Sequence, residues 1–182
     1  MVAVHAVLVC FVIAGALPLI AGCYQFLLAG LNGFLKRWTA APPGTEPRVA
    51  VIVPAWNEGA VIGRTIDTLC ALDYEPERLR VYVVDDASTD DTPAVVQAKA
   101  AQYPGRVFHL RRENGGEGKA HTINHGLRTI RADAWYEAVL IIDADVIFTK
   151  QSLRRMVRHF ARDGVGAVTA YIKEGSRPAN LT

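Results

Sequence analysis

Apolar positions follow two different patterns along the 182 residues of this chain. The stretch 2–35 holds no Asp, Glu, Lys or Arg and is rich in Val, Leu, Ile, Ala and Phe. About 20 apolar residues span a bilayer as a helix, so this pattern predicts a transmembrane helix within residues 1–38. A cleaved signal peptide would have a basic start and a shorter apolar core, and the sequence has neither.

Charges that follow this stretch predict its orientation. Lys36, Arg37 and Arg48 lie after it, with Trp38 as an interfacial anchor, and nothing basic precedes it except the amino terminus. Basic residues favour the cytoplasmic side. We therefore expect a protein of the inner (plasma) membrane whose remaining residues lie in the cytoplasm, after a Pro-rich linker at 39–47.

From residue 48 onward, short apolar runs alternate with stretches of helical periodicity. Strands are predicted at 49–53, 79–84, 107–110, 138–142 and 165–172. Helices are predicted at 58–72, from a cap at residue 89 or 90 to about 103, from 119 to about 131, and at 153–162. This alternation predicts βαβ units, and hence an α/β domain with a mostly parallel sheet over residues 48–182.

Three of the predicted strands end in carboxylates. The first is followed by Pro54, Ala55, Asn57 and Glu58, the second by Asp85 and Asp86, and the fourth by Asp143 and Asp145. The carboxyl ends of parallel strands meet at one edge, where open α/β sheets bind ligands. A single D-x-D is often only a helix cap, but acids on three strand ends favour a site. Two acids one residue apart suit a hard divalent cation shared with substrate phosphates.

Other ligands and chemistries leave weaker signals. No G-x-G-x-x-G follows the first strand, and Glu113 and Ala120 exclude a P-loop around Gly118 and Lys119. His121 and His125 lack the Glu of an H-E-x-x-H zinc site. Two alternatives stay open: a phosphohydrolase with Asp143 as nucleophile, and a non-catalytic membrane subunit whose strand-end acids are structural.

Net charge and cysteine content bear on the binding partners and the cellular compartment. The net charge of +2 and the absence of a long basic run give no argument for nucleic-acid binding. Cys10, Cys23 and Cys70 do not form the pattern of a disulfide framework or a zinc site, so a reducing compartment is expected.

Four motifs in order resemble those of the family 2 inverting glycosyltransferases, which have the Rossmann-like GT-A fold. They are Val51-Ile52-Val53-Pro54-Ala55-Trp56-Asn57-Glu58, Val83-Val84-Asp85-Asp86-Ala87-Ser88-Thr89-Asp90, the Gly-rich stretch from Asn114 to Leu127, and Asp143-Ala144-Asp145. The resemblance covers about residues 48–178. Together with the apolar lead-in, it is nearest to the membrane branch that contains cellulose, hyaluronan and poly-N-acetylglucosamine synthases.

The resemblance implies a UDP-sugar donor, Mg²⁺ or Mn²⁺, and a polysaccharide or lipid acceptor at a membrane. Its donor-binding residues would be Pro54, Ala55, Asn57, Glu58, Asp85, Asp86, Lys119, Asn124 and Asp143. Lys119 would face the diphosphate, Asp143 would contact the ribose or the metal, and Asp145 would bind the metal.

The sequence also departs from the family pattern. The Thr/Glu-Asp motif that supplies the catalytic base in the family does not follow Asp143-Ala144-Asp145 in this sequence, and Gln-x-x-Arg-Trp is absent as well. We therefore expect an amino-terminal, donor-binding part of such an enzyme. Glu117 lengthens the glycine-rich loop relative to the commoner Asn-Gly-Gly-Lys form.

Overall fold

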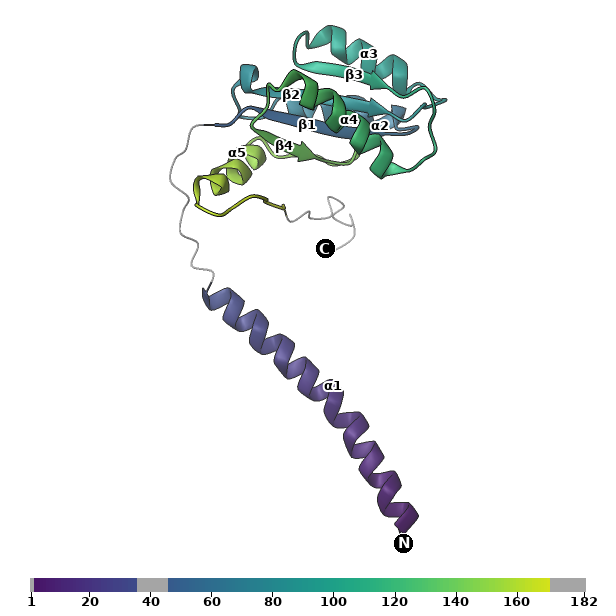
Figure 1. Cartoon of the computed structure of the whole chain (residues 1–182), viewed down its shortest axis with the longest axis vertical. Helices are drawn as coiled ribbons and strands as arrows, with labels where there is room; N and C mark the ends of the chain where they lie inside the picture. Colours follow the sequence, from purple (N-terminus) through teal and green to yellow (C-terminus); the bar gives the residue numbers. More distant parts are fainter. Residues whose placement is uncertain (1, 36–45, 171–182) are drawn as a thin grey trace, which may run out of the picture. The chain divides into compact units, whose positions relative to one another are not determined.

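The computed structural model describes residues 2–35 and 46–170, which fall into two units (Figure 1). The first contains one helix, α1 (Val2–Leu35), and the second is an α/β unit. The predicted linker at 39–47 lies outside the described residues, apart from its last two positions.

The α/β unit has four parallel strands in the order β3-β2-β1-β4. The strands are β1 (Val49–Ala55), β2 (Leu79–Asp85), β3 (Val107–Arg111) and β4 (Ala138–Ile141). The helices are α2 (Gly59–Cys70), α3 (Thr92–Gln102), α4 (Lys119–Asp133) and α5 (Ser152–Val157), with short 3-10 helices at Pro76–Arg78 and Arg158–Ala161. The predicted α/β class and the first four strands are thus confirmed.

Two predicted elements differ from the structure. The helix expected at 153–162 is α5 followed by a 3-10 turn, so it is shorter than its apolar spacing indicated. The strand expected at 165–172 is wrong over residues 165–170, which pair with no strand, and its last two residues lie outside the described part. A β-branched run becomes a strand only where a neighbouring strand accepts its hydrogen bonds.

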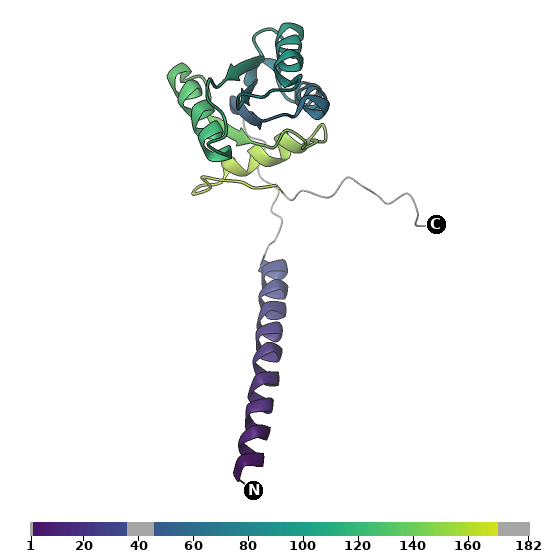
Figure 2. The same cartoon turned by 90° about the vertical axis from the view of Figure 1, so that its right-hand side faces the viewer.

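Side chains of β1 alternate between two hydrophobic layers, because successive residues of a strand point to opposite faces. Val49, Val51 and Val53 pack with α2, α3 and α5, whereas Ala50 and Ile52 pack on the α4 side. Figure 2 shows α4 on one side of the sheet and α2 and α3 on the other. Strand β1 is therefore buried except at the half-buried Pro54, and its carboxyl end is held by its pairing with β2.

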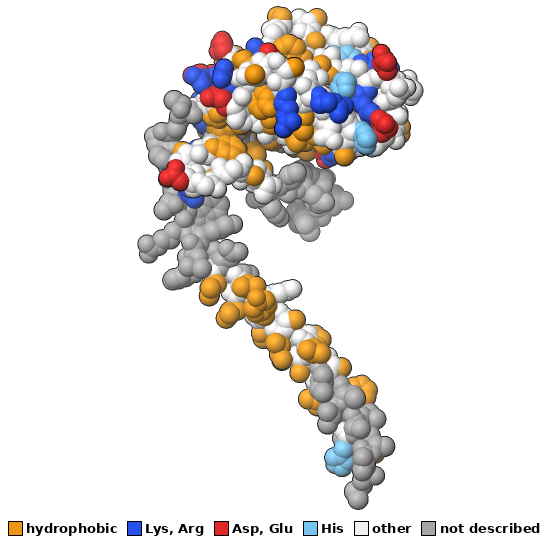
Figure 3. All heavy atoms as spheres, in the orientation of Figure 1, with side chains coloured by type: hydrophobic (Ala, Val, Ile, Leu, Met, Phe, Trp, Pro, Cys, Tyr) orange, Lys and Arg blue, Asp and Glu red, His pale blue; other side chains and the backbone are white. Residues whose placement is uncertain are grey.

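Helix α1 confirms the helical part of the first prediction, but not the membrane part. Its described side chains are largely apolar and exposed, among them Phe11, Leu19 and Phe26 (Figure 3). A membrane span needs an apolar helix of about 20 residues. Within the stretches 2–35 and 46–170 no helix proves long and apolar enough to cross a bilayer, so the predicted transmembrane helix is not supported.

Candidate functional site

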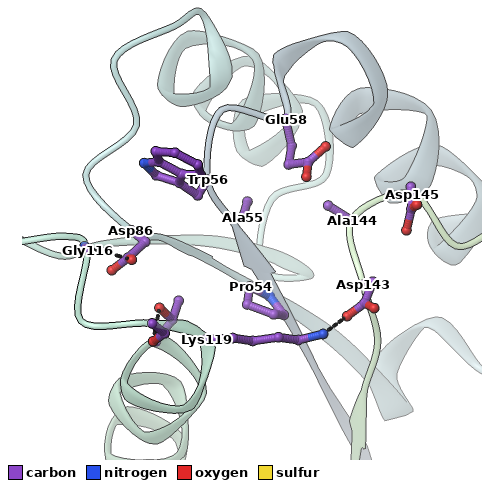
Figure 4. A pocket seen from close by; sticks show the side chains of 12 residues that line it. Pro54, Ala55, Trp56, Glu58, Asp86, Gly116, Lys119, Asp143, Ala144 and Asp145 are labelled. Atoms are coloured by element: carbon purple, nitrogen blue, oxygen red, sulfur yellow. Dashed lines mark hydrogen bonds and ion pairs between the residues drawn. The ribbon is translucent and has the colours of Figure 1, made fainter.

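The carboxyl ends of β1, β2 and β4 and the amino end of α4 surround a cavity of about 570 Å³ (Figure 4). Its lining residues are Pro54, Ala55, Trp56, Glu58, Asp86, Gly116, Gly118, Lys119, Thr122, Asp143, Ala144 and Asp145. Acids from all three predicted strand ends therefore reach one cavity. Parallel pairing brings them together, because it aligns the carboxyl ends of neighbouring strands at the same edge.

The two adjacent acids at the end of β2 face different surroundings. Asp85 is fully buried, accepts hydrogen bonds from the Ser88 N–H (2.8 Å) and Arg111 Nη1 (2.9 Å), and does not line the cavity. Asp86 does line the cavity, where its Oδ2 accepts from the N–H of Gly116 at 3.2 Å. Asp85 thus holds the loop after β2, and Asp86 forms part of the cavity wall.

Buried Arg112 joins Asp86 to the glycine-rich loop. Its guanidinium forms ion pairs with Asp86 on one side and with Glu117 on the other. A Cβ on Gly115 would lie 2.2 Å from the backbone oxygen of Asp86, so only glycine lets the loop approach this closely. Sequence reasoning missed Arg112, since nothing in its local sequence indicates which distant acid it would neutralise.

Helix α4 begins at the cavity wall. Gly118 precedes it with a φ of 91°, and Lys119 is its first residue. The first N–H groups of a helix have no partner within the helix, and the helix dipole favours an anion at this end. Lys119 forms an ion pair with Asp143 across the cavity, and both side chains are more than half exposed (Figure 4). An anionic ligand would meet the lysine and the helix end together.

The acids of the D-A-D segment flank a buried residue. Asp143 and Asp145 are exposed to the cavity, whereas Ala144 packs in the core. The segment forms a turn closed by the Val146 N–H, which donates to the Asp143 carbonyl at 3.3 Å. Both carboxylates therefore project from one tight turn into the same open space.

This pair of acids fits a divalent cation that is shared with a ligand. Mg²⁺ and Mn²⁺ prefer carboxylate, phosphate and water oxygens, and Mg²⁺ is usually held by one or two carboxylates plus substrate phosphates. Among the residues that the structure describes, no group of three or more His, Cys, Asp or Glu side chains could hold a metal by itself. Asp143 and Asp145 can therefore supply part of a coordination shell that a bound diphosphate completes.

The loop after β1 supplies a residue that the predicted site lacked. Trp56 lines the cavity with 63% of its surface exposed, so its ring is free to contact a ligand. The sequence feature that could have indicated Trp56 is that a large aromatic residue directly follows a buried strand. Glu58 also lines the cavity, and its backbone N–H donates to the buried hydroxyl of Thr92 at 2.8 Å.

Three of the predicted donor-binding residues do not line the cavity: Asn57, Asp85 and Asn124. Asn57 has a φ of 55°, and its side-chain oxygen accepts from the N–H of Thr89 at 2.9 Å, which fixes the neighbouring loop. Asn124 is exposed on α4. The cavity brings together the other six, Pro54, Ala55, Glu58, Asp86, Lys119 and Asp143, with the predicted metal ligand Asp145.

Strand-end acids, a glycine-rich loop and a helix amino terminus around one cavity are features of a nucleotide-binding α/β domain. Residues 50–180 match Glycosyl transferase family 2. The chain therefore belongs to glycosyltransferase family 2, whose members carry out nucleotide-sugar transfer.

Relatives and solved structures agree with this assignment. The chain is 39% identical over 122 residues to β-monoglucosyldiacylglycerol synthase of Synechocystis, covering 67% of this chain and 25% of the relative. It is 28% identical over 127 residues to the UDP-forming cellulose synthase catalytic subunit of Pseudomonas fluorescens, covering 70% of this chain and 16% of the relative. A mannosyltransferase of Pyrobaculum calidifontis, solved with GDP-Man and Mn²⁺, superposes with a TM-score of 0.68 at 36% identity, over 80% of this chain and 42% of that one.

These similarities confirm the predicted family and its transferase chemistry, and they do not favour a phosphohydrolase. The relatives include a glycolipid synthase and a cellulose synthase, but membership of a membrane-anchored branch is not confirmed. The chain spans between about a sixth and a quarter of the length of these two relatives.

Proposed function

We propose that this chain binds a nucleoside-diphosphate sugar in the strand-end cavity, with UDP as the preferred nucleotide. In this proposal Asp86 accepts a hydrogen bond from the base, and Trp56 covers the base or the sugar. The amino end of α4 and Lys119 orient the diphosphate. One observation carries the proposal: a single cavity joins Asp86, Lys119 and the two acids of the D-A-D turn.

We further propose that Asp143 and Asp145 hold Mg²⁺ or Mn²⁺ when the donor binds. The cation supplies positive charge that stabilises the diphosphate as a leaving group. The Pyrobaculum mannosyltransferase, solved with Mn²⁺, supports this cofactor. The same protein binds GDP-Man, whereas the cellulose synthase relative is UDP-forming, so both nucleotides belong in the test.

The whole protein is proposed to transfer the sugar, with inversion, to a lipid or polysaccharide acceptor. The similarity to β-monoglucosyldiacylglycerol synthase favours a lipid. Direct displacement needs a base to remove the proton from the acceptor hydroxyl. No Thr/Glu-Asp motif to supply it follows Asp143-Ala144-Asp145 in this sequence, so we expect the 182-residue chain to bind the donor with little turnover.

Calorimetric titration of the chain with UDP and GDP, each with and without Mn²⁺, tests the proposal. We expect UDP to bind more tightly than GDP, and more tightly with Mn²⁺ than without it. Asp86→Asn should weaken UDP binding both with and without Mn²⁺. Asp145→Asn should abolish only the gain in UDP affinity that Mn²⁺ gives. Asp163→Asn, on a turn outside the cavity, is the control. Absence of heat with both nucleotides would contradict the proposal.

A further inference from the structure

Thr65 of α2 contacts the backbone of the D-A-D turn. Its side-chain oxygen donates to the backbone carbonyl of Ala144 at 2.5 Å, across 79 positions of sequence. Thr65 is buried, with 1% of its surface exposed, and it is not among the residues that line the cavity. It therefore touches neither a ligand nor a metal directly.

This hydrogen bond lies between Asp143 and Asp145 in the turn, so it can influence the placement of both. The Ala144 carbonyl belongs to the peptide that joins Ala144 to Asp145, while Asp143 precedes it in the same turn. With the Ala144 side chain packed in the core and its carbonyl held by α2, the peptide plane cannot rotate freely. The backbone positions from which the two carboxylates project are consequently held in a fixed relation to each other.

Loss of the hydroxyl would leave a buried carbonyl without its partner. Such a group is costly, so the peptide would turn toward another donor or toward solvent. A cation bound by only two protein carboxylates is sensitive to such a change, because few other ligands hold it in place. Groups that orient metal ligands typically change metal affinity roughly 10- to 100-fold when they are removed.

We propose that Thr65 is a positioning residue for the metal site of the donor-binding cavity. This inference rests on the proposed function, and it assigns to α2 the task of fixing the spacing of Asp143 and Asp145. Base recognition at Asp86 lies at the end of another strand and does not depend on Thr65.

The test compares hydroxyl and non-hydroxyl side chains at position 65. Thr65→Val keeps the shape and removes the hydroxyl, whereas Thr65→Ser and Thr65→Ala both lack the methyl group and differ only in the oxygen. Thr68→Val is the matched control, since the Thr68 hydroxyl donates to the Thr65 carbonyl within α2 at 2.9 Å. Each variant is titrated with UDP in the presence and absence of Mn²⁺, and the EPR spectrum of bound Mn²⁺ is recorded.

We expect Thr65→Val and Thr65→Ala to lose about tenfold or more of the affinity gain that Mn²⁺ gives, with metal-free UDP binding unchanged. Thr65→Ser and Thr68→Val should keep both the gain and the wild-type EPR spectrum. A full Mn²⁺ gain in folded Thr65→Val would overturn the inference. So would failure of both Val and Ala variants to fold while Ser folds, because the hydroxyl would then serve folding itself. Absence of any Mn²⁺ gain in the wild-type chain would instead contradict the proposed metal site.

Discussion

Arg112 is a single buried cation that neutralises two carboxylates, Asp86 of the cavity and Glu117 of the glycine-rich loop. Arg112→Gln would leave the nearly buried Asp86 without its counter-charge. Removing one partner of a buried ion pair typically costs about 3–5 kcal/mol, so we expect the free energy of unfolding to fall by this order. Urea denaturation followed by circular dichroism measures the change. Arg128→Gln is the control, since Arg128 is exposed on α4, and an equal loss in both variants would refute the role of Arg112.

Trp56 is a second single residue with a testable role, which we expect in nucleotide affinity and not in the stability of the fold. Its ring is mostly exposed, so Trp56→Ala should change the unfolding free energy little. Stacking of a base on an aromatic ring contributes about 1–3 kcal/mol, and nucleotide affinity should fall accordingly in a fluorescence or calorimetric titration. Trp56→Phe should retain most of that affinity. Equal binding by the Ala and Phe variants would show that the ring does not contact the nucleotide.

Single residues mark the limit of what the sequence could predict about the site. The resemblance favours Asp86 over Asp85 as the ligand-binding acid, and the structure shows which side of the strand end each one faces. The Thr65–Ala144 contact could not be predicted from the sequence, since it depends on how α2 packs against a turn that lies far along the chain. Acids at strand ends were predictable because they follow buried runs directly.

At the scale of elements, α4 lies close to the sheet because Gly126 has no side chain. A Cβ at this position would lie 2.9 Å from Val84 Cγ2 and 3.2 Å from Ile52 Cγ2. Overpacking of this kind usually costs about 1–3 kcal/mol, so Gly126→Ala should destabilise the α/β unit despite its better helix propensity. It should also displace the amino end of α4 and weaken nucleotide binding.

Gly63→Ala on α2 is the matched comparison for this experiment. Its added Cβ would meet Val95 Cγ1 at 3.2 Å and the flexible end of Lys99 at 3.6 Å. We expect a smaller change in stability and no change in nucleotide affinity, both measured as for Gly126→Ala. If the two variants were equally stable, the close approach of α4 to the sheet would not be a constraint.

Most elements were predictable from periodicity. Apolar residues recur about every 3.6 positions in a half-buried helix, and a buried strand is a continuous apolar run. The exceptions lie beyond β4. Residues 153–162 have a helical pattern, but only the first six positions from Ser152 form α5, and residues 165–170 have a strand pattern without a paired neighbour. Pairing depends on the rest of the sheet, which local sequence does not encode.

At the scale of the whole α/β unit, Glu137 links the start of β4 to the start of β1. Its carboxylate accepts from the Arg48 N–H at 2.8 Å and from Arg48 Nε at 3.3 Å. These hydrogen bonds, the backbone one first, lower the pKa of Glu137 below its ordinary value of 4.5. A lowered folded-state pKa adds stability above the ordinary value, and this stability is lost as the pH falls through the folded-state pKa.

Glu137→Gln should therefore flatten the decline in melting temperature below about pH 4.5. Near neutral pH the variant should melt slightly earlier than the wild type. Thermal unfolding between acid and neutral pH measures both effects, with Glu77→Gln on the first 3-10 helix as the control. If the melting temperatures of the wild type and Glu137→Gln fell with pH in parallel, the Glu137–Arg48 hydrogen bonds would have no role in acid stability.

The cellular location of the protein and the division into residues 1–38, 39–47 and 48–182 stay predictions. The charge pattern after the apolar stretch predicts a protein of the inner (plasma) membrane whose α/β unit lies on the cytoplasmic side. The family, in contrast, is shown by the match over residues 50–180.

The alternation of β1 between two hydrophobic layers has a consequence for insertions and deletions. Adding or removing one residue at the start of this strand would turn the residues that follow it to the opposite faces, sending Val51 and Val53 to the α4 side and Ile52 to the other. It would also move Pro54 and Ala55 out of the cavity wall. Length variation among natural or engineered homologues should therefore be excluded from this strand and be tolerated only in loops whose side chains contribute to neither layer.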